Sequence, residues 1–390
     1  MNKKIIYHLI FVFIVSFLLK IIVDQIEGLN PVIKAIGDIK FSDLYFSINK
    51  KESPSDIYIV DIGHKDPLKS REEIANFITQ INTHYKPKVI GVDVYFDEKF
   101  KDAAINKRLI EQLSSDNVIR VFKVNQTPTI FPDFSVLPGL DTNTISADGY
   151  SFGLGKPTAY PCVRFFKPTL EIENTKYHHI SKLIAEKYSK ESGQKLSEDM
   201  NFENKMMINY NVKFVKNRID INDSTRYHEL KDKIVLIGLN TYKADGLPLY
   251  NDDTHFTPKN KNYIGRSVQD SYGVEILGTI ISNLIENEYL SYSPLFVRIL
   301  NWLLSLIIYI TLLYLFVYLN ESFVFFKVIS QTVGVLLLVL VSVGVIEYTN
   351  HYIDLSPAIG VMFISAEIVE IVEELLRKFP KYIKSKLSNE

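Results

Sequence analysis

Four long apolar segments constrain the fold of this chain most, because each is long enough to cross a lipid bilayer. They cover residues 5–23, 295–319, 324–346 and 355–372. About 20 apolar residues in a helix span the hydrocarbon core, and three such segments in close succession are unusual in a soluble protein. The sequence therefore predicts one transmembrane helix before, and three after, a polar region of residues 24–294.

The first segment allows a second interpretation, a cleaved signal peptide. The residues that follow it, VDQIEGLN, lack the pattern of small residues at which signal peptides are cut. The charged Lys20 lies close enough to the end of the segment to reach the membrane surface. We therefore expect residues 1–23 to remain as a transmembrane anchor.

Basic residues predict how these helices are oriented. Lys3 and Lys4 precede the first segment, Lys327 lies beside the first C-terminal turn, and more basic residues follow in the tail of residues 373–390. Basic loops and tails stay in the cytoplasm, and an even number of spans places both chain ends on one side. We expect a multi-pass membrane protein, embedded in the bilayer through residues 295–372, with residues 24–294 outside the cytoplasm.

The charge balance argues against nucleic acid as a partner, since the chain has 44 Lys and Arg against 45 Asp and Glu. The single cysteine, Cys162, excludes an intramolecular disulfide framework and a structural zinc site built from cysteines. The adjacent His178 and His179 point in different directions on a helix. We expect a solvated or capping role for these two histidines rather than a metal site.

The polar region begins with a strand, a helix and a second strand. Residues 56–62 and 86–96 are apolar with little polar alternation, which is typical of parallel strands covered by helices on both faces. Between them, apolar residues recur at helical spacing, and Ser70 and Glu73 form the pattern of a capping box. These apolar positions are Ile74, Phe77, Ile78, Ile81 and Tyr85. We predict a βαβ unit within an α/β fold, a three-layer sandwich with a mostly parallel sheet.

Weaker patterns extend this fold along the chain. Helices are expected at residues 102–113, 178–190 and 274–287, and strands at 118–124, 205–210 and 233–239. The last of these strands is continuously apolar and therefore central. Residues 162–172 suggest a pair of strands. Prolines and glycines predict an irregular loop over residues 127–161, and a second long polar loop covers residues 240–272.

Two aspartates lie where predicted strands end. Asp61 closes the first strand and Asp93 lies near the end of the second, at the edge where open α/β sheets bind ligands. On neighbouring strands the two could bind Mg²⁺ or share a proton, and Asp97 and Asp245 are further candidates. Three roles stay open: capping of turns, binding of a ligand or ion, and catalysis. No motif indicates a particular cofactor.

Several motifs together resemble one family of sensory domains. They are the strands IYIVDIG and VIGVDVYF, the strands INY and KDKIVLIG, and ADGLPLYNDDTHFTP leading to YGVEILGTIISNLI. In this order, between one N-terminal and three C-terminal spans and with HYIDLSP before the last span, they resemble the type-two CHASE family. Its members are extracytoplasmic sensory modules of bacterial signalling proteins. The resemblance covers nearly the whole chain and implies a location in the bacterial inner membrane.

The resemblance also marks individual residues. They are Asp61, Asp93, Asp245, Thr257, Pro258, Gly273 and Glu275. From this set and the strand-end pattern, the candidates for ligand binding are Asp61, Asp93, Asp97, Asp245, Thr257 and Glu275, and none is expected to be catalytic. The helix opening GVEILG departs from the family, which often has histidine and alanine at the positions of Leu277 and Gly278.

Family members usually carry a catalytic output domain after the last span, whereas this sequence stops at Glu390. We therefore expect a sensor or ligand-binding module that acts through a partner protein. Ile368, Val372, Leu375 and Phe379 have heptad-like spacing, on which an effector or a second copy of the chain could dock. A plain juxtamembrane helix is the alternative. Two other functions stay open, a scaffold in an envelope complex and a metal-dependent extracytoplasmic hydrolase.

Overall fold

The computed structural model describes twelve parts of the chain. These are residues 40–48, 54–64, 67–94, 96, 102–122, 145–147, 162–172, 175–196, 206–250, 253–259, 269–319 and 323–363. The chain divides into two compact units. We call Asp43–Ser291 the α/β unit, and Met1–Ser42 together with Tyr292–Glu390 the helical unit. The predicted first span, residues 5–23, and the heptad-like residues near the C-terminus lie outside the described residues.

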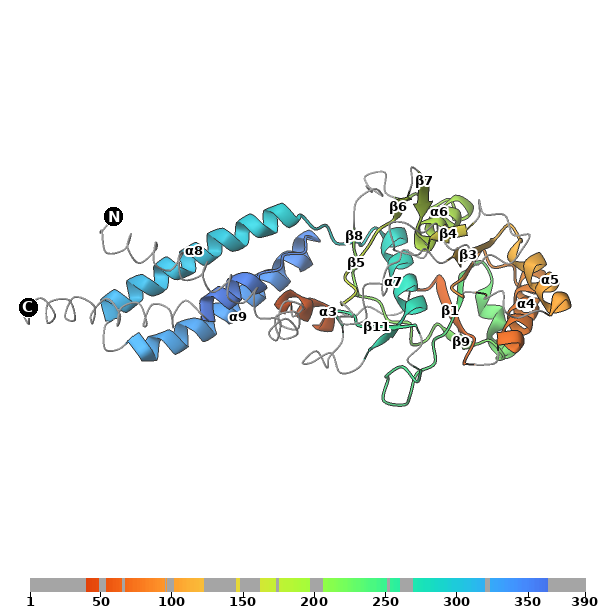
Figure 1. The fold of residues 1–390 in the computed structure, drawn as a ribbon, viewed down its shortest axis with the longest axis horizontal. Helices are drawn as coiled ribbons and strands as arrows, with labels where there is room; N and C mark the ends of the chain where they lie inside the picture. The colour runs from red at the N-terminus through yellow and green to blue at the C-terminus, as the bar shows by residue number, and fades with distance from the viewer. Residues whose placement is uncertain are drawn as a thin grey trace, which may run out of the picture. The chain divides into compact units, whose positions relative to one another are not determined.

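The α/β unit is built on a six-stranded parallel sheet, with strand order β4-β3-β2-β10-β1-β9 (Figure 1). Its strands are β1 (Ile57–Asp61), β2 (Val89–Val92), β3 (Val118–Phe122), β4 (Ile145–Ala147), β9 (Arg218–Asp220) and β10 (Ile234–Gly238). The predicted α/β class with a parallel sheet is confirmed. So is the central place of β10, which is buried along all five residues, as a strand between two others and beneath helices must be.

From their βαβ pattern we expected the first two strands to be neighbours in the sheet. They are not. The central strand β10 lies between them, pairing with β1 on one side and with β2 on the other. The crossover through α4 (Pro67–His84) therefore skips one strand position. Sequence periodicity indicates which segments are strands, but it carries no information on which later strand is inserted between them.

Helices pack on both faces of this sheet. On one face, α4 and α5 (Ala103–Leu113) bury Phe77, Ile78 and Leu109 against the strands. On the other face, α6 (Ile180–Ser192) and α7 (Gly273–Glu286) bury Ile184 and Leu277. Figure 1 shows α4 beside α5. Four of the predicted apolar positions of the first helix, Ile74, Phe77, Ile78 and Ile81, form the core, whereas Tyr85 follows the end of the helix and is half-buried beside it.

The helix starts depend on capping groups that the sequence indicates only in part. α4 begins at Pro67, so Ser70 lies inside the helix and the predicted capping box is wrong. Proline suits the first turn of a helix because its φ is already helical and its missing N–H is not needed there. Asp102 caps α5, and His179 caps α6 by accepting a hydrogen bond from Ser181 N, which confirms the capping role expected there.

Short elements complete the α/β unit. Three antiparallel pairs form: β5 (Phe165–Phe166) with β8 (Met206–Met207), β6 (Thr169–Ile172) with β7 (Thr175–His178), and β11 (Thr254–His255) with β12 (Ser271–Tyr272). The predicted pairing within residues 162–172 is wrong, because β5 and β6 each pair with a later strand. The described residues also include the 3₁₀ helix η4 (Ser224–Leu230) and the short α3 (Leu44–Ile48) in this unit, and the 3₁₀ helix η2 (Phe41–Asp43), which lies across the boundary between the two units.

The helical unit contains two long apolar helices, α8 (Pro294–Leu319) and α9 (Phe323–Thr349), and a further helical segment at residues 356–363. Both α8 and α9 are long and apolar enough to cross a membrane. Their large apolar side chains face outward; Trp302 is 69% exposed and Leu336 is 58% exposed. An apolar surface of this kind needs lipid or protein around it rather than water. These helices match the predicted spans 295–319 and 324–346.

Candidate functional site

The register of the three central strands places the two predicted aspartates at one edge of the sheet. Asp61 pairs with Gly238 of β10, and Val92 of β2 pairs with Ile237, so Asp93 follows at the level of Gly238. Two strand spacings put the Asp61 and Asp93 Cα atoms about 10 Å apart. Because side chains alternate along a strand, both aspartates lie on the face covered by α6 and α7.

Asp61 uses both carboxylate oxygens within the protein. Its Oδ1 accepts hydrogen bonds from Gly63 N (3.0 Å) and Asn240 N (2.9 Å), and its Oδ2 accepts one from Thr241 Oγ1 (2.6 Å). These bonds join the turn after β1 to the turn after β10. Of the three roles open for Asp61, the geometry supports capping of turns.

Asp93 differs from Asp61, because its carboxylate has no hydrogen-bond partner among the residues that the structure describes. Burial, and then the nearby Asp253 carboxylate, raise the pKa of Asp93 well above its usual value. The Oδ1 atom of Asp253 lies 3.3 Å from His255 Nε2, where it accepts a hydrogen bond or forms an ion pair. Its carboxylate also lies against Gly273, the first residue of α7. Asp253 thus lies at the N-terminus of α7, which has no side-chain cap, and is near enough to Asp93 to act on its charge.

Asn240 adds an unused amide at the same end of β10. Its side chain is 3% exposed, and within the described part of the chain neither Oδ1 nor Nδ2 has a hydrogen-bond partner. A buried amide without a partner costs free energy. Nearby in the chain after β1, the exposed His64 ring stacks on Tyr250 with 4.8 Å between the ring centroids. Polar and aromatic groups that can contact a ligand therefore follow each of these strands.

Glu275, in the first turn of α7, lies in a buried ionic cluster. Its Oε1 is 3.3 Å from Lys259 Nζ and 3.2 Å from Arg218 Nη2, and its Oε2 accepts a hydrogen bond from the Tyr242 hydroxyl. The Arg218 guanidinium also lies 4.1 Å from the centre of the Tyr242 ring. Burial disfavours the charged carboxylate, but Lys259 and Arg218 outweigh it, so the pKa of Glu275 lies below its usual value.

Thr257 is held by a second buried carboxylate. Asp270 accepts hydrogen bonds from Thr257 N (2.8 Å) and Thr257 Oγ1 (2.5 Å). Burial raises the pKa of Asp270 despite these bonds and the nearby Lys259. Together with the Glu275 cluster, this pair fastens the polar segment after β10 to the start of α7.

The predicted site residues therefore fall into three groups. Asp61 and Asp93 share the carboxyl edge of the sheet, whereas Thr257 and Glu275 belong to the ionic contacts around α7. Asp245 is exposed, and its Oδ1 accepts from Leu247 N (3.0 Å), which makes it a turn cap. Asp97 lies outside the described residues.

Sequence analysis missed several residues of this region. They are Arg218, Asn240, Tyr242, Asp253 and Lys259. The DDTHFTP motif contains Asp253 but gives no sign that it faces Asp93. Arg218 was missed because the short edge strand β9 carries charged residues at both ends and has too few apolar residues to be recognised. Among the described residues, no group of three or more His, Cys, Asp or Glu could hold a metal ion.

Comparison with known proteins gives a family for the chain. The family model of the CHASE2 domain matches residues 10–317. No curated protein and no solved structure is significantly similar to the chain. CHASE2 domains are extracytoplasmic sensory domains. This agrees with the resemblance of the strand and helix motifs and with the two membrane-capable helices found among the described residues. This protein belongs to the CHASE2 domain family.

Proposed function

We propose that this protein is a multi-pass sensor of the bacterial inner membrane, whose α/β unit lies outside the cytoplasm and binds a ligand at the carboxyl edge of its sheet. Membership of the CHASE2 family carries the sensory role. The proposed layout has an anchor at residues 1–23, the sensory domain at 24–294, three spans at 295–372 and a cytoplasmic tail. A partner that docks near Ile368 would pass the signal on.

The ligand site is assigned to the edge near Asp93 because two polar groups there remain without partners. The Asn240 amide is buried and lacks a hydrogen-bond partner in the described chain, and the half-buried Asp93 carboxylate makes no side-chain hydrogen bond there, whereas Asp61 and Glu275 are fully engaged. Buried polar groups are nearly always hydrogen-bonded. A ligand that formed hydrogen bonds with Asp93 and Asn240 would therefore gain more binding free energy from them than from Asp61 and Glu275, whose oxygens already have partners.

The helix α7 is suited to carry the response, because its first turn lies at this edge and its end leads towards the helical unit. Glu275 connects that turn to Lys259 and Tyr242 in the segment after β10. At the other end of α7 only residues 287–293 precede α8. A ligand can shift α7 only by binding one of its two arrangements more tightly than the other.

A ligand screen tests this proposal. Purified full-length protein is heated with each member of a panel of amino acids, organic acids, sugars and divalent cations, and the unfolding midpoint of the α/β unit is recorded. We expect at least one compound to raise the midpoint of the wild type, and we expect Asp93→Asn to abolish that rise. Asp245→Asn, at an exposed turn, is the matched control and should leave it unchanged.

Three outcomes would contradict the proposal. A compound that stabilises wild type and Asp93→Asn equally would remove the site from the Asp93 edge. Stoichiometric co-purification of envelope proteins, with no compound changing the midpoint, would instead favour a scaffold. Phosphoester hydrolysis by metal-loaded protein would support the hydrolase alternative.

A further inference from the structure

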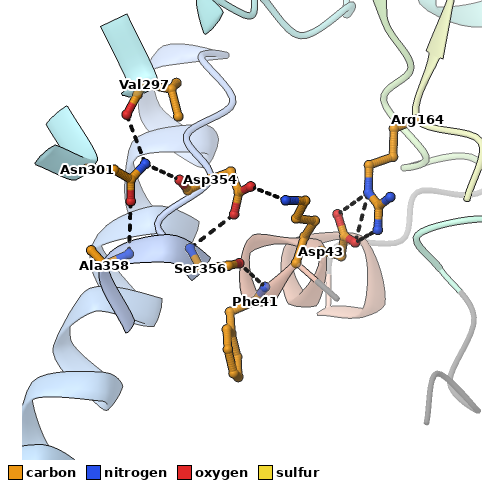
Figure 2. Close-up of polar contacts among 9 residues, drawn as sticks. Phe41, Asp43, Arg164, Val297, Asn301, Asp354, Ser356 and Ala358 are labelled. Carbon is orange, nitrogen blue, oxygen red and sulfur yellow. Dashed lines mark hydrogen bonds and ion pairs between the residues drawn. The ribbon is translucent and has the colours of Figure 1, made fainter. Parts of the chain in front are cut away.

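The helical unit contains a polar cluster that the proposed ligand site does not involve. We call it the Asp354 cluster; it consists of Lys40, Phe41, Asn301, Asp354, Ser356 and Ala358 (Figure 2). These residues come from three stretches that are far apart in the sequence: residues 40–41, the second turn of α8, and the residues that begin the helical segment 356–363. Polar side chains are expensive in apolar helices and are usually retained for a reason.

Asn301 fixes the start of the last helical segment against α8. This side chain is buried, and its Nδ2 donates to Asp354 O (2.7 Å) and to Val297 O (2.9 Å), while its Oδ1 accepts from Ala358 N (3.1 Å). Ala358 N is one of the backbone donors that a helix leaves unpaired in its first turn. Contacts between apolar helices do not specify one relative position, whereas these bonds do.

Asp354 ties residues 40–41 to the same place. Its Oδ2 pairs with Lys40 Nζ at 2.7 Å, and its Oδ1 accepts from Ser356 N at 3.0 Å. Ser356 Oγ in turn accepts a hydrogen bond from Phe41 N at 2.9 Å. Figure 2 shows these contacts in sequence around the Asp354 carboxylate. One turn of the helical unit therefore holds two consecutive residues of the N-terminal part of the chain.

The cluster lies within the helical unit, and its residues 40–41 and Asn301 are each within about ten residues, along the chain, of a place where the chain passes from one unit to the other. The first passage follows Ser42 and the second follows Ser291. Residues 40–41 directly precede the first, and α8 begins at Pro294, directly after the second. Inside the α/β unit, the first residue, Asp43, is itself fixed, because it is buried and pairs with the buried Arg164 at 2.6 Å.

We propose that the Asp354 cluster is a latch, which holds the two chain passages and the start of the last helical segment together so that they move as one body. While it is closed, a displacement of either passage is carried to the segment 356–363. When it opens, these three stretches move independently. This inference concerns the helical unit and does not depend on the ligand site near Asp93.

Hydrogen exchange of full-length protein in lipid nanodiscs tests the latch, because three of its bonds are donated by the backbone amides of Phe41, Ser356 and Ala358. We expect Asp354→Ala to speed exchange about tenfold at Phe41 and Ala358 as well as at Ser356, the effect of losing one or two hydrogen bonds. Faster exchange at Ser356 alone would show a local helix cap and would overturn the latch.

A charge exchange separates the ion pair from the cap. Lys40→Asp alone should speed exchange at Phe41, and Lys40→Asp combined with Asp354→Lys should slow it again, because the two charges still attract. Ser356 N should stay fast in the double variant, since a lysine cannot accept its hydrogen bond. The proposal would be contradicted if the Phe41 amide exchanged as fast in the double variant as in Lys40→Asp alone.

Two measures keep the test decisive. Exchange within α7 of the α/β unit should be unchanged in every variant, which shows that the protein is folded. Should Asp354→Ala fail to accumulate, Lys40→Ala replaces it, because the Lys40 side chain is 27% exposed and the Asp354 carboxylate keeps its hydrogen bond from Ser356 N. A latch then predicts faster exchange at both Phe41 and Ala358, whereas an isolated ion pair predicts it at Phe41 only.

Discussion

Glu275 shows how a single residue joins a polar loop to a helix of the core. The carboxylate is buried, yet Lys259, Arg218 and Tyr242 each contact it. Removing the buried partner of such an ion pair leaves the two partly exposed cations, Lys259 and Arg218, without their counter-charge in a poorly hydrated place, which costs more than the pair itself contributes. The cluster therefore makes the position of the first turn of α7 sensitive to any change in the segment after β10.

This arrangement predicts a large effect of Glu275→Gln. We expect it to lower the free energy of unfolding of the α/β unit by about 3–5 kcal/mol, because Lys259 and Arg218 lose their carboxylate. Thermal unfolding of the full-length protein measures this. Asp245→Asn is the control, with an expected change within about 0.5 kcal/mol; equal effects of the two variants would show that the cluster is not ionised.

His179 gives the α/β unit a dependence on pH. Burial lowers its pKa to about 3, so the folded protein holds it neutral while the unfolded chain protonates it near its ordinary pKa of about 6.5. The resulting stability is present above that ordinary pKa and is lost as the pH falls towards 3. Between about pH 7 and pH 5 the loss is about 2 kcal/mol.

The comparison with His179→Asn isolates this contribution. Asparagine can still cap α6 but does not titrate. The unfolding midpoint of the His179→Asn protein should therefore fall less than that of the wild type between pH 7 and pH 5. Identical slopes for the two proteins would place the pH dependence elsewhere.

Asp93 should make the stability of the α/β unit change with pH in the opposite direction to His179. Its raised pKa means that the folded state favours the uncharged acid, so this residue costs stability as the pH rises above about 4, the ordinary pKa of an aspartate. We expect Asp93→Asn to raise the free energy of unfolding at neutral pH by on the order of 1 kcal/mol, seen as a higher unfolding midpoint, and to change it little near pH 4. A lower midpoint at neutral pH would mean that the ionised carboxylate is stabilised by a partner.

At the residue scale, the sequence indicated only the part of the site that strands determine. Asp61 and Asp93 follow apolar strands whose ends must meet at one edge, and the structure places both there. Asn240 and Asp253 lie in a polar segment, where no periodicity relates position in the chain to position in space. Their contacts depend on the conformation of the turns after β10, and individual residue types do not predict that conformation.

At the level of elements, the close contact between α7 and the segment before β11 requires glycine at the helix start. A Cβ atom on Gly273 would lie 2.5 Å from Asp253 Oδ2, well inside the normal contact distance. Similarly, a Cβ on Gly238 would lie 2.9 Å from Val274 Cβ. These two glycines allow the first turn of α7 to approach β10 and Asp253.

A pair of variants tests this contact. Gly273→Ala should destabilise the α/β unit by about 1–2 kcal/mol, because Asp253 must move. In an Asp253→Ala background the same substitution should be nearly neutral, since the obstructing carboxylate is gone. An equal cost of Gly273→Ala in both backgrounds would assign it to the helix start itself rather than to Asp253.

Elements with a strong apolar pattern agree with the sequence, and those without it do not. The central strand β10 and the apolar face of α4 could be predicted because buried positions are occupied by apolar residues at regular spacing in the sequence. β9 is three residues long, and α4 begins at a proline three positions before the predicted cap. Strand order also escaped prediction, since the placement of β10 between β1 and β2 depends on contacts far apart in the chain.

For the whole molecule, the proposed function requires the α/β unit to lie on one side of a membrane that α8 and α9 cross. The family match spans the whole α/β unit and continues into α8. The outward apolar side chains of α8 and α9 agree with a bilayer around them. If both chain ends lie in the cytoplasm, the α/β unit must be exported for the protein to sense an external signal.

Cysteine labelling in spheroplasts tests this placement most directly. In a Cys162→Ser background, one cysteine replaces the exposed Lys190 of α6 and, in a second protein, Lys386 of the predicted tail. We expect a membrane-impermeant maleimide to label Lys190→Cys in intact spheroplasts, and Lys386→Cys only after the membrane is opened. Labelling of Lys386→Cys but not of Lys190→Cys in intact spheroplasts would place the α/β unit in the cytoplasm and contradict an extracytoplasmic sensor.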